Sequence, residues 1–215
     1  MRAFLELAKA GLIGDLNDDG KNSVLQMDSV TRRLISLVND LVDAGKIELG
    51  HFHLELKPFC LQEVLHAALS SVAALAEQRE ITFDLTENDA FVLADQDRTT
   101  QVLINLFANA IKYSPAHAVV KVRLARQGEF ARISVSDSGP GIPPDDLAHI
   151  FDRFRQIDKA SYKRENSSGL GLYIAKDIVE KQGGTIDVES EPKNGSTFWF
   201  TVPLNQDEEQ KDLLT

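Results

Sequence analysis

From about Leu54 to Pro203 the sequence alternates between short apolar strand patterns and amphipathic helical patterns. The spacing is too irregular for repeated strand–helix–strand units, which would build a parallel sheet. Two pairs of strand patterns flank short turns at residues 126–129 and 192–195, as in β-hairpins. The sequence therefore predicts an α+β fold, a two-layer sandwich in which helices cover a mainly antiparallel sheet.

Hydrophobic periodicity assigns the individual elements of this region. The expected helices are Leu61–Gln78, Asp97–Tyr113, Pro144–Phe151 and Leu170–Gln182. The expected strands are Ile81–Leu85, Phe91–Ala94, Val119–Ala125, Ala131–Ser136, Gly184–Ser190 and Thr197–Pro203. Residues 205–215 are polar, and we expect them to form a frayed tail.

The first 50 residues carry helical patterns only. An apolar stripe at residues 4–13 and a polar turn at 14–20 precede an expected helix over Asn22–Asp43. Apolar residues seven positions apart form an a/d seam, namely Met27, Leu34 and Leu41 together with Val30, Leu37 and Ala44. One interpretation is an amphipathic hairpin that packs on its own domain. The other, which we favour, is a hairpin that pairs with a second copy in a four-helix bundle, because two helices alone bury little of both apolar faces.

Charge and cysteine content exclude several classes of protein. Lys and Arg number 23 against 33 Asp and Glu, a net charge of −10 that argues against nucleic-acid and anionic-membrane partners. The lone Cys60 excludes an intrachain disulfide and a multi-cysteine zinc site. Because no run of 18 apolar residues occurs and no leader pattern opens the chain, we expect a cytoplasmic protein region without membrane contact.

The expected helix Asp97–Tyr113 has one apolar face and one face of amides and an ammonium group. At 100° per residue, Asn105, Asn109 and Lys112 fall on the same side. An Asn carbonyl oxygen can complete the shell of a phosphate-bound Mg²⁺ ion, and a lysine supplies a point charge to phosphates. The plainer interpretation is a solvated polar face, but two asparagines inside one helix need a reason.

Three further segments follow that helix in a fixed order. Asp137-Ser-Gly-Pro-Gly-Ile142 comes directly after an apolar strand. The Asp137 carboxylate at the end of that strand could accept a hydrogen bond from the amino group of adenine. Ser167-Ser-Gly-Leu-Gly-Leu172 opens a helix and aims backbone N–H groups at an anion. Between them, Ile150–Gln156 and the polar stretch 157–166 supply phenylalanines and cations for a loop over phosphates. Each segment alone is also typical of an ordinary turn or surface loop. Their occurrence together, in this order and spacing, is a strong indication of a binding site.

These segments resemble the ATP-binding motifs of sensor histidine kinases, in the superfamily shared with Hsp90-type chaperones, gyrase B and MutL. Residues 105–115, Asn-Leu-Phe-Ala-Asn-Ala-Ile-Lys-Tyr-Ser-Pro, resemble the N box, 137–142 the G1 box, 150–154 the F box and 168–172 the G2 box. The ending Gly195-Ser-Thr-Phe-Trp-Phe-Thr-Val-Pro-Leu204 is similar to the closing strand of the family. The resemblance implies a Bergerat-type ATP-binding domain over residues 51–204, with residues 155–168 as the lid over ATP.

The resemblance also implies roles for individual residues, with ATP and Mg²⁺ as cofactors. Asn109 would be the Mg²⁺ ligand, supported by Asn105, while Asp137 would recognise the adenine amino group. Lys112 and Tyr113 would meet the phosphates or the surroundings of the base. The other ATP-binding residues implied by the motifs are Gly139, Gly141, Ile142, Phe154, Arg155, Ser168, Gly169, Leu170, Gly171 and Leu172.

Residues 1–50 resemble the later part of the dimerisation and histidine-phosphotransfer hairpin of the family, with Leu34–Gly50 similar to its second helix. The H box with its phosphoacceptor is absent, because none of the five histidines (His51, His53, His66, His117, His149) lies on the first helix. The sequence therefore predicts either a piece of a longer kinase, which elsewhere can carry a membrane anchor, or a natural protein without the acceptor. The implied partners are a second copy, through a weakened hairpin, and a response-regulator receiver domain.

The favoured function is transfer of the γ-phosphoryl group of ATP to a histidine and onward to a response-regulator aspartate. The alternative is a non-catalytic dimeric ATP-binding or adaptor module, and a third candidate, a serine kinase of the anti-sigma type, is disfavoured by the helical hairpin. Two positions depart from the family pattern. Gln156 stands where many relatives have an arginine for the γ-phosphate, so Arg155, Lys163 or Arg164 would substitute, and Ser167 replaces the first glycine of the G2 pattern.

Overall fold

The computed structural model of the chain describes residues 7, 14, 16–86, 90–155 and 168–205. The chain divides into two compact units, residues 1–50 and 51–215, which are described separately below. The apolar stripe expected between Phe4 and Ile13, the lid residues 156–167 and residues 206–215 of the tail lie outside the described residues.

The first unit contains the long helix α2, Asp18–Glu48. At its N-terminus the Asn17 side-chain oxygen accepts a hydrogen bond from Gly20 N at 2.8 Å, and two aspartates stand in the first turn. After its C-terminus Gly50 adopts a φ of +68°, the left-handed conformation that commonly ends helices. The expected bounds Asn22–Asp43 are therefore wrong at both ends, because the predicted polar turn contains the cap and the first turn of the helix and because the helix continues to Glu48.

Most of the a/d seam of α2 is exposed on a single chain. Met27, Val30, Leu34 and Leu41 expose 55–60% of their surface, whereas Ala44 is buried. Apolar side chains aligned along one helix face favour association, because burial removes them from water. Pairing of this stripe with a second copy stays a prediction.

The second unit is built on a five-stranded sheet with the strand order β2-β4-β5-β7-β6. β2 (Thr82–Thr86) runs parallel to β4 (Val119–Gln127). The sheet continues antiparallel through β5 (Phe130–Asp137), β7 (Ser196–Pro203) and β6 (Ile186–Ser190). The β4–β5 and β6–β7 hairpins turn where the sequence predicts, so the mainly antiparallel sheet is confirmed.

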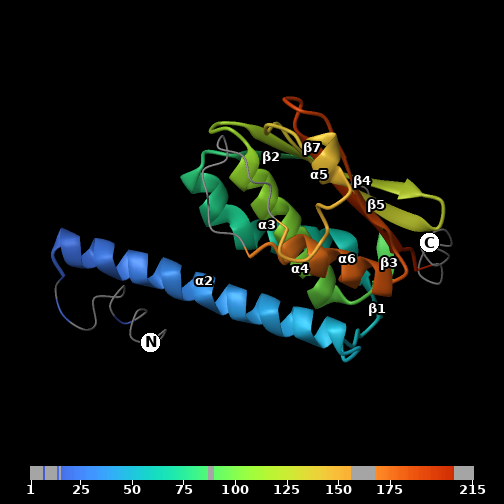
Figure 1. The fold of residues 1–215 in the computed structure, drawn as a ribbon, viewed down its shortest axis with the longest axis horizontal. Coiled ribbons are helices and arrows are strands. Elements are labelled where there is room, and N and C mark those ends of the chain that lie inside the picture. Colours follow the sequence, from blue (N-terminus) through green and yellow to red (C-terminus); the bar gives the residue numbers. More distant parts are fainter. Residues whose placement is uncertain (1–6, 8–13, 15, 87–89, 156–167, 206–215) are drawn as a thin grey trace, which may run out of the picture. The chain divides into compact units, whose positions relative to one another are not determined.

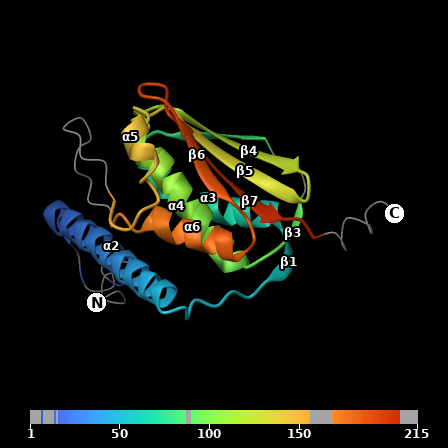
Figure 2. The same cartoon turned by 45° about the vertical axis from the view of Figure 1, so that its right-hand side comes forward.

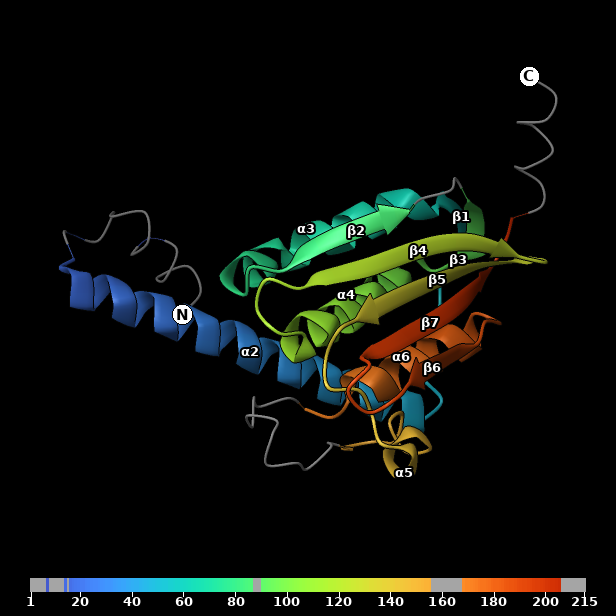
Figure 3. The same cartoon turned by 90° about the horizontal axis from the view of Figure 1, so that it is seen from above.

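Three helices cover one face of this sheet, as Figures 1 to 3 show: α3 (Leu61–Gln78), α4 (Gln96–Tyr113) and α6 (Gly171–Lys181). The middle helix α4 packs on α3, on α6 and on β5. Phe107 of α4 meets Phe83 of β2 edge to face, with ring centroids 5.4 Å apart. The predicted apolar face of α4 is buried throughout, at Leu103, Leu106, Phe107, Ala110 and Ile111. The two-layer α+β sandwich is therefore confirmed.

Two elements differ from the sequence expectation. β1 (Lys57–Cys60) was not predicted, and it pairs antiparallel with β3 (Phe91–Ala94) in a separate two-stranded sheet. α5 (Pro144–Leu147) is shorter than the expected helix Pro144–Phe151. Beyond Leu147 the hydrogen bonds from His149 N to Asp146 O and from Asp152 N to His149 O form tight turns in place of a helix.

Residues Phe52–Glu55, here called the strap, hold the chain before β1 against the ends of α4 and α6. Phe52 is buried, with the Arg98 guanidinium carbon 4.6 Å and the Lys181 ammonium nitrogen 5.3 Å from its ring centre. The last backbone N–H of the strap donates to Asp95 Oδ2 at 2.9 Å. The strap is therefore an integral part of the second unit.

Candidate functional site

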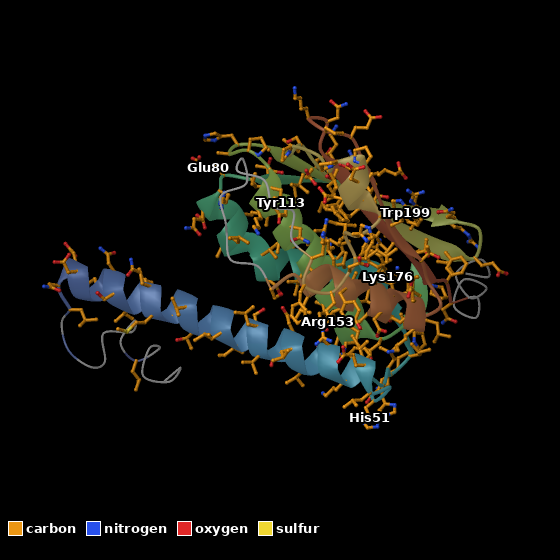
Figure 4. All side chains as sticks on the ribbon, viewed as in Figure 1. His51, Glu80, Tyr113, Arg153, Lys176 and Trp199 are labelled. Carbon is orange, nitrogen blue, oxygen red and sulfur yellow. The ribbon has the colours of Figure 1, made fainter. Side chains whose placement is uncertain are left out.

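The polar face of α4 carries the first group of predicted site residues. Asn105 Nδ2 donates a hydrogen bond to Gly171 O at 3.1 Å, which joins the middle of α4 to the start of α6. Asn109 is half-buried, and its amide has no hydrogen-bond partner among the residues that the structure describes. Lys112 Nζ lies 3.3 Å from Tyr113 Oη and 4.8 Å from the centre of the Tyr113 ring. Tyr113, labelled in Figure 4, stands at the C-terminal end of the helix.

The C-terminal end of α4 contacts the loop that follows β5. Gly139 N donates to Asp137 Oδ1 at 2.8 Å. A Cβ atom at Gly139 would lie 2.7 Å from both Asp137 Oδ1 and the Tyr113 carbonyl oxygen, closer than real Cβ contacts come. Glycine is thus required there because the loop backbone passes directly against the end of the helix.

Asp137 is the most electrostatically perturbed acid of the described residues. Burial raises its pKa from 3.8 to about 6, while hydrogen bonds from the N–H groups of Gly139 and Ser196 oppose the shift. The carboxylate is therefore held in a poorly solvated position that favours a proton or a hydrogen-bond donor beside it. Motif reasoning does not identify Ser196. Its contact follows from the strand register, in which Asp137 pairs with Ser196 across β5 and β7.

The Asp137–Ile142 loop is held at its far end by the turn between β6 and β7. Lys193 N donates to Pro140 O at 2.7 Å, and Ile142 N donates to Ser190 Oγ at 2.8 Å. Gly141 has a φ of +70°, and any Cβ atom there would overlap the carbonyl oxygen of Glu191. The loop and the turn therefore form one packed structure at the same end of the sheet as α5 (Figures 1 and 2).

The second glycine loop packs against the segment that follows α5. Gly169 and Phe154 both adopt a positive φ, +68° and +60°, and a Cβ atom at Gly169 would lie 2.8 Å from the Phe154 carbonyl carbon. Leu170 is buried, and its N–H donates to Ser168 Oγ at 3.2 Å. The predicted F and G2 segments are therefore in direct contact.

Arg155 is engaged in an ion pair with α5. Its Nη2 atom lies 2.9 Å from Asp146 Oδ1. Use of Arg155 as the cation for a γ-phosphate stays a prediction. The other candidates for that role, Lys163 and Arg164, and the departures at Gln156 and Ser167 lie outside the described residues.

The N-terminus of α6 supplies the remaining predicted residues. Gly171 and Leu172 begin the helix, and a Cβ atom at Gly171 would lie 3.4 Å from the Asn105 amide. The first N–H groups of a helix have no acceptor within it and favour an anion. Lys176, labelled in Figure 4, lies one turn further along α6. Its ammonium nitrogen is 5.8 Å from the Phe151 ring centre.

One amide on the polar face of α4 is a potential ligand for a metal ion. The described residues contain no group of three or more His, Cys, Asp or Glu side chains that could hold a metal ion. The half-buried Asn109 amide offers one neutral oxygen. Mg²⁺ commonly binds through one or two protein oxygens, with phosphates and waters completing its shell. The donor set therefore fits Mg²⁺ bound together with a nucleotide.

The structure thus brings the predicted segments together around α4. Asn105 joins Gly171, Tyr113 joins Gly139, and Phe154 joins Gly169. A helix with amides and an ammonium group, flanked by a half-buried carboxylate and by a helix N-terminus, is suited to bind an anion that carries a hydrogen-bonding ring.

Comparison with known proteins assigns this arrangement to a family. The family model described as "Histidine kinase-, DNA gyrase B-, and HSP90-like ATPase" matches residues 94–206. The chain is 34% identical over 212 residues to the sensor histidine kinase WalK of Bacillus subtilis (strain 168), covering 97% of this chain and 34% of that protein. It is also 34% identical over 194 residues to the circadian input-output histidine kinase CikA of Synechococcus elongatus, covering 88% of this chain and 26% of that protein.

A solved structure agrees with these relatives. Full-length ShkA in complex with AMPPNP aligns with a TM-score of 0.73 and 28% identity, over 93% of this chain and 42% of that one. The chain therefore belongs to the histidine kinase-, DNA gyrase B- and HSP90-like ATPases. Within that family it carries a region homologous to the catalytic ATP-binding part of sensor histidine kinases. It spans about a third of the length of WalK and about a quarter of that of CikA. None of the described helices is long and apolar enough to cross a membrane.

Proposed function

We propose that the second unit binds ATP with Mg²⁺ and acts as the catalytic region of a protein-histidine kinase. The observation that supports this most is the junction at α4, where Asn105 contacts one glycine loop and the end of the helix contacts the other beside the half-buried Asp137 carboxylate. An ATP molecule needs a recognition site for its base and a cationic, donor-rich site for its phosphates. The C-terminal end of α4 and the middle of its polar face offer these two sites.

At one end, Asp137 recognises the base. Its carboxylate accepts a hydrogen bond from the amino group of adenine and repels the carbonyl oxygen that guanine carries at that position. Gly139 and Gly141 shape the loop around the carboxylate, and the buried Ile142 ends it. The proposed ATP-binding residues on this side therefore run from the end of β5 at Asp137 to Ile142, which contacts the last residue of β6.

At the other site, protein groups meet the phosphates. The Asn109 oxygen and the phosphate oxygens would hold Mg²⁺, which neutralises phosphate charge when bound. Asn105 supports this face through Gly171, and Lys112 adds a positive charge close to Tyr113. Ser168–Leu172 present backbone N–H groups at the start of α6, with Phe154 and Arg155 beside them.

In the whole protein we propose that a histidine imidazole attacks the γ-phosphorus in line, with ADP as the leaving group, and that a response-regulator aspartate later takes the phosphoryl group from the histidine. Catalysis then consists mainly of positioning and of stabilising phosphate charge. No histidine of this sequence lies in an H box, so the acceptor is assigned to sequence beyond it. The exposed seam of α2 is the proposed homodimer contact.

Calorimetric titration of the chain with a non-hydrolysable ATP analogue and Mg²⁺ tests the ATP site. We expect micromolar-range binding, which corresponds to about −8 kcal/mol. Asn109→Ala and Asp137→Ala should abolish it, while Asn39→Ala, an exposed amide on α2, should leave it unchanged. A folded parent chain that binds no nucleotide would contradict the proposal and leave a scaffold with a kinase fold, the alternative function.

A further inference from the structure

The turn between β6 and β7 interlocks with the Asp137–Ile142 loop, although more than 40 residues separate the two in sequence. Besides the hydrogen bond from Lys193 N to Pro140 O, the backbones approach so closely at Gly195 that a Cβ atom there would overlap the Asp137 carbonyl oxygen. None of the motifs identified in the sequence explains why this turn is held so tightly to the loop.

Ser190, the last residue of β6, is the centre of this contact. Its hydroxyl donates to Gly195 O at 2.7 Å and accepts from Ile142 N at 2.8 Å. Since a hydroxyl has one hydrogen, Ser196 Oγ, 3.0 Å away, must be the donor in the pair that the two serines form. The Ser190 hydroxyl therefore makes one donated and two accepted hydrogen bonds, its full capacity.

These three bonds hold two segments that lie against Asp137, the loop that follows it and the start of the neighbouring strand β7. Ile142 ends the loop that Asp137 begins, and Ser196 donates its backbone N–H to the Asp137 carboxylate. Loss of the Ser190 hydroxyl would leave the N–H of Ile142 and the carbonyl of Gly195 without this partner. Both the loop and the N–H donor to the carboxylate would then lose a fixed position.

We propose that Ser190 is a positioning residue for nucleotide recognition, which fixes the Asp137 carboxylate where it selects adenine without touching the nucleotide itself. The inference rests on the proposed ATP function. A hydrogen bond weakens steeply when its distance and angle leave their optimum, so a carboxylate that moves by a fraction of an ångström discriminates less between bases.

The test compares ATP with inosine triphosphate, which carries a carbonyl oxygen in place of the adenine amino group. Each is titrated with Mg²⁺ into the parent chain and into three variants. We expect Ser190→Ala to weaken ATP binding about tenfold and inosine triphosphate binding by less than about twofold. Ser190→Thr, which keeps the hydroxyl, should retain the selectivity. The matched control Ser134→Ala removes a half-buried hydroxyl of β5 for which no hydrogen bond is described, and it should change neither affinity.

A second readout is the pH dependence of ATP binding. In Ser190→Ala the midpoint should move to higher pH, because the N–H groups that stabilise the ionised carboxylate are held less firmly. Equal loss of both nucleotides, or a variant identical to the parent, would overturn the positioning role while the ATP function stands. If the alanine variant does not fold, the equally sized Ser190→Thr and Ser190→Val variants isolate the hydroxyl. A parent chain that binds neither nucleotide overturns the proposed function itself.

Discussion

Asp137 shows at the scale of one residue how a binding site can oppose stability. Its pKa is raised by burial from 3.8 to about 6, so in that window the folded chain keeps a proton that the unfolded chain releases. As pH rises through the window, this carboxyl therefore lowers the free energy of unfolding. In the proposed function, the ionised form is the better acceptor of a hydrogen bond from adenine. The proposed recognition thus uses the charged form of Asp137, which burial destabilises.

We predict that ATP affinity falls as pH is lowered from about 7.5 to about 5.5, with a midpoint near 6. Asp137→Asn should bind ATP weakly with no such midpoint, and the same variant corrects for titration of the nucleotide's phosphates. Its unfolding free energy relative to the parent should rise by about 2 kcal/mol from pH 4 to 7. Calorimetry and urea unfolding measure the two effects, and a relative stability that falls with pH would contradict the assignment.

Two glycines with the same backbone conformation distinguish the cost of backbone strain from the cost of steric overlap when alanine replaces glycine. Gly128 and Gly141 have φ of +61° and +70°, but only Gly141 lacks space for a Cβ atom. We predict that Gly128→Ala costs about 1 kcal/mol of unfolding free energy and that Gly141→Ala costs at least about 2 kcal/mol more. Urea unfolding followed by the fluorescence of Trp199, the one tryptophan of the sequence, measures both. Equal costs would show that the Glu191 turn moves aside freely.

Residue types and spacing predicted which segments meet around α4, while the binding roles of their residues stay predictions. Two asparagines inside one helix and two glycine loops indicate a site because asparagine is a poor helix former and glycine permits close backbone contacts. Ser190 and Ser196 could not be predicted in this way. Their hydroxyl and amide partners follow from the register of β5, β6 and β7, and a serine in a strand carries no signal of that register.

At the scale of secondary-structure elements, periodicity predicted the bounds of α3 and β3 but not those of α2, β1 and α5. α3 has the expected bounds, because its apolar face repeats over several turns. β1 was missed because Lys57 and Pro58 interrupt any alternation, and its pairing with β3 depends on tertiary contacts. α5 was overextended because Phe151 continues an apolar pattern that the backbone does not follow as a helix.

The helix α2 carries a prediction at the same scale. Leu34 and Leu41 are more than half exposed on one chain, and the proposed homodimer would bury them. We predict that Leu34→Glu with Leu41→Glu weakens self-association at least tenfold, about 1.4 kcal/mol or more, because charges cannot enter the seam. The control Ser36→Glu with Asn39→Glu adds the same charge at exposed polar positions. Sedimentation at several concentrations measures the association constant. Equal association of both variants would exclude the seam as the homodimer contact.

At the scale of the whole molecule, the strap shows that the second unit begins before its first strand. We predict that Phe52→Ala lowers the free energy of unfolding of this unit by about 3 kcal/mol, because a buried ring is removed from between two cations. His53→Ala, an exposed neighbour, should change it by less than about 0.5 kcal/mol. Urea unfolding detected at Trp199 distinguishes the two, and similar values would mean that the strap lies on the surface without stabilising it.

The strap also determines where the chain can be truncated at its N-terminal end without loss of contacts in the second unit. A family match that starts at residue 94 and a first strand that starts at Lys57 both suggest later boundaries for an excised ATPase piece. A fragment that begins at Lys57 would expose the ends of α4 and α6 that Phe52 covers, and it would leave Asp95 Oδ2 without its backbone donor. The smallest piece of the chain that keeps the full nucleotide-binding unit therefore begins no later than Phe52.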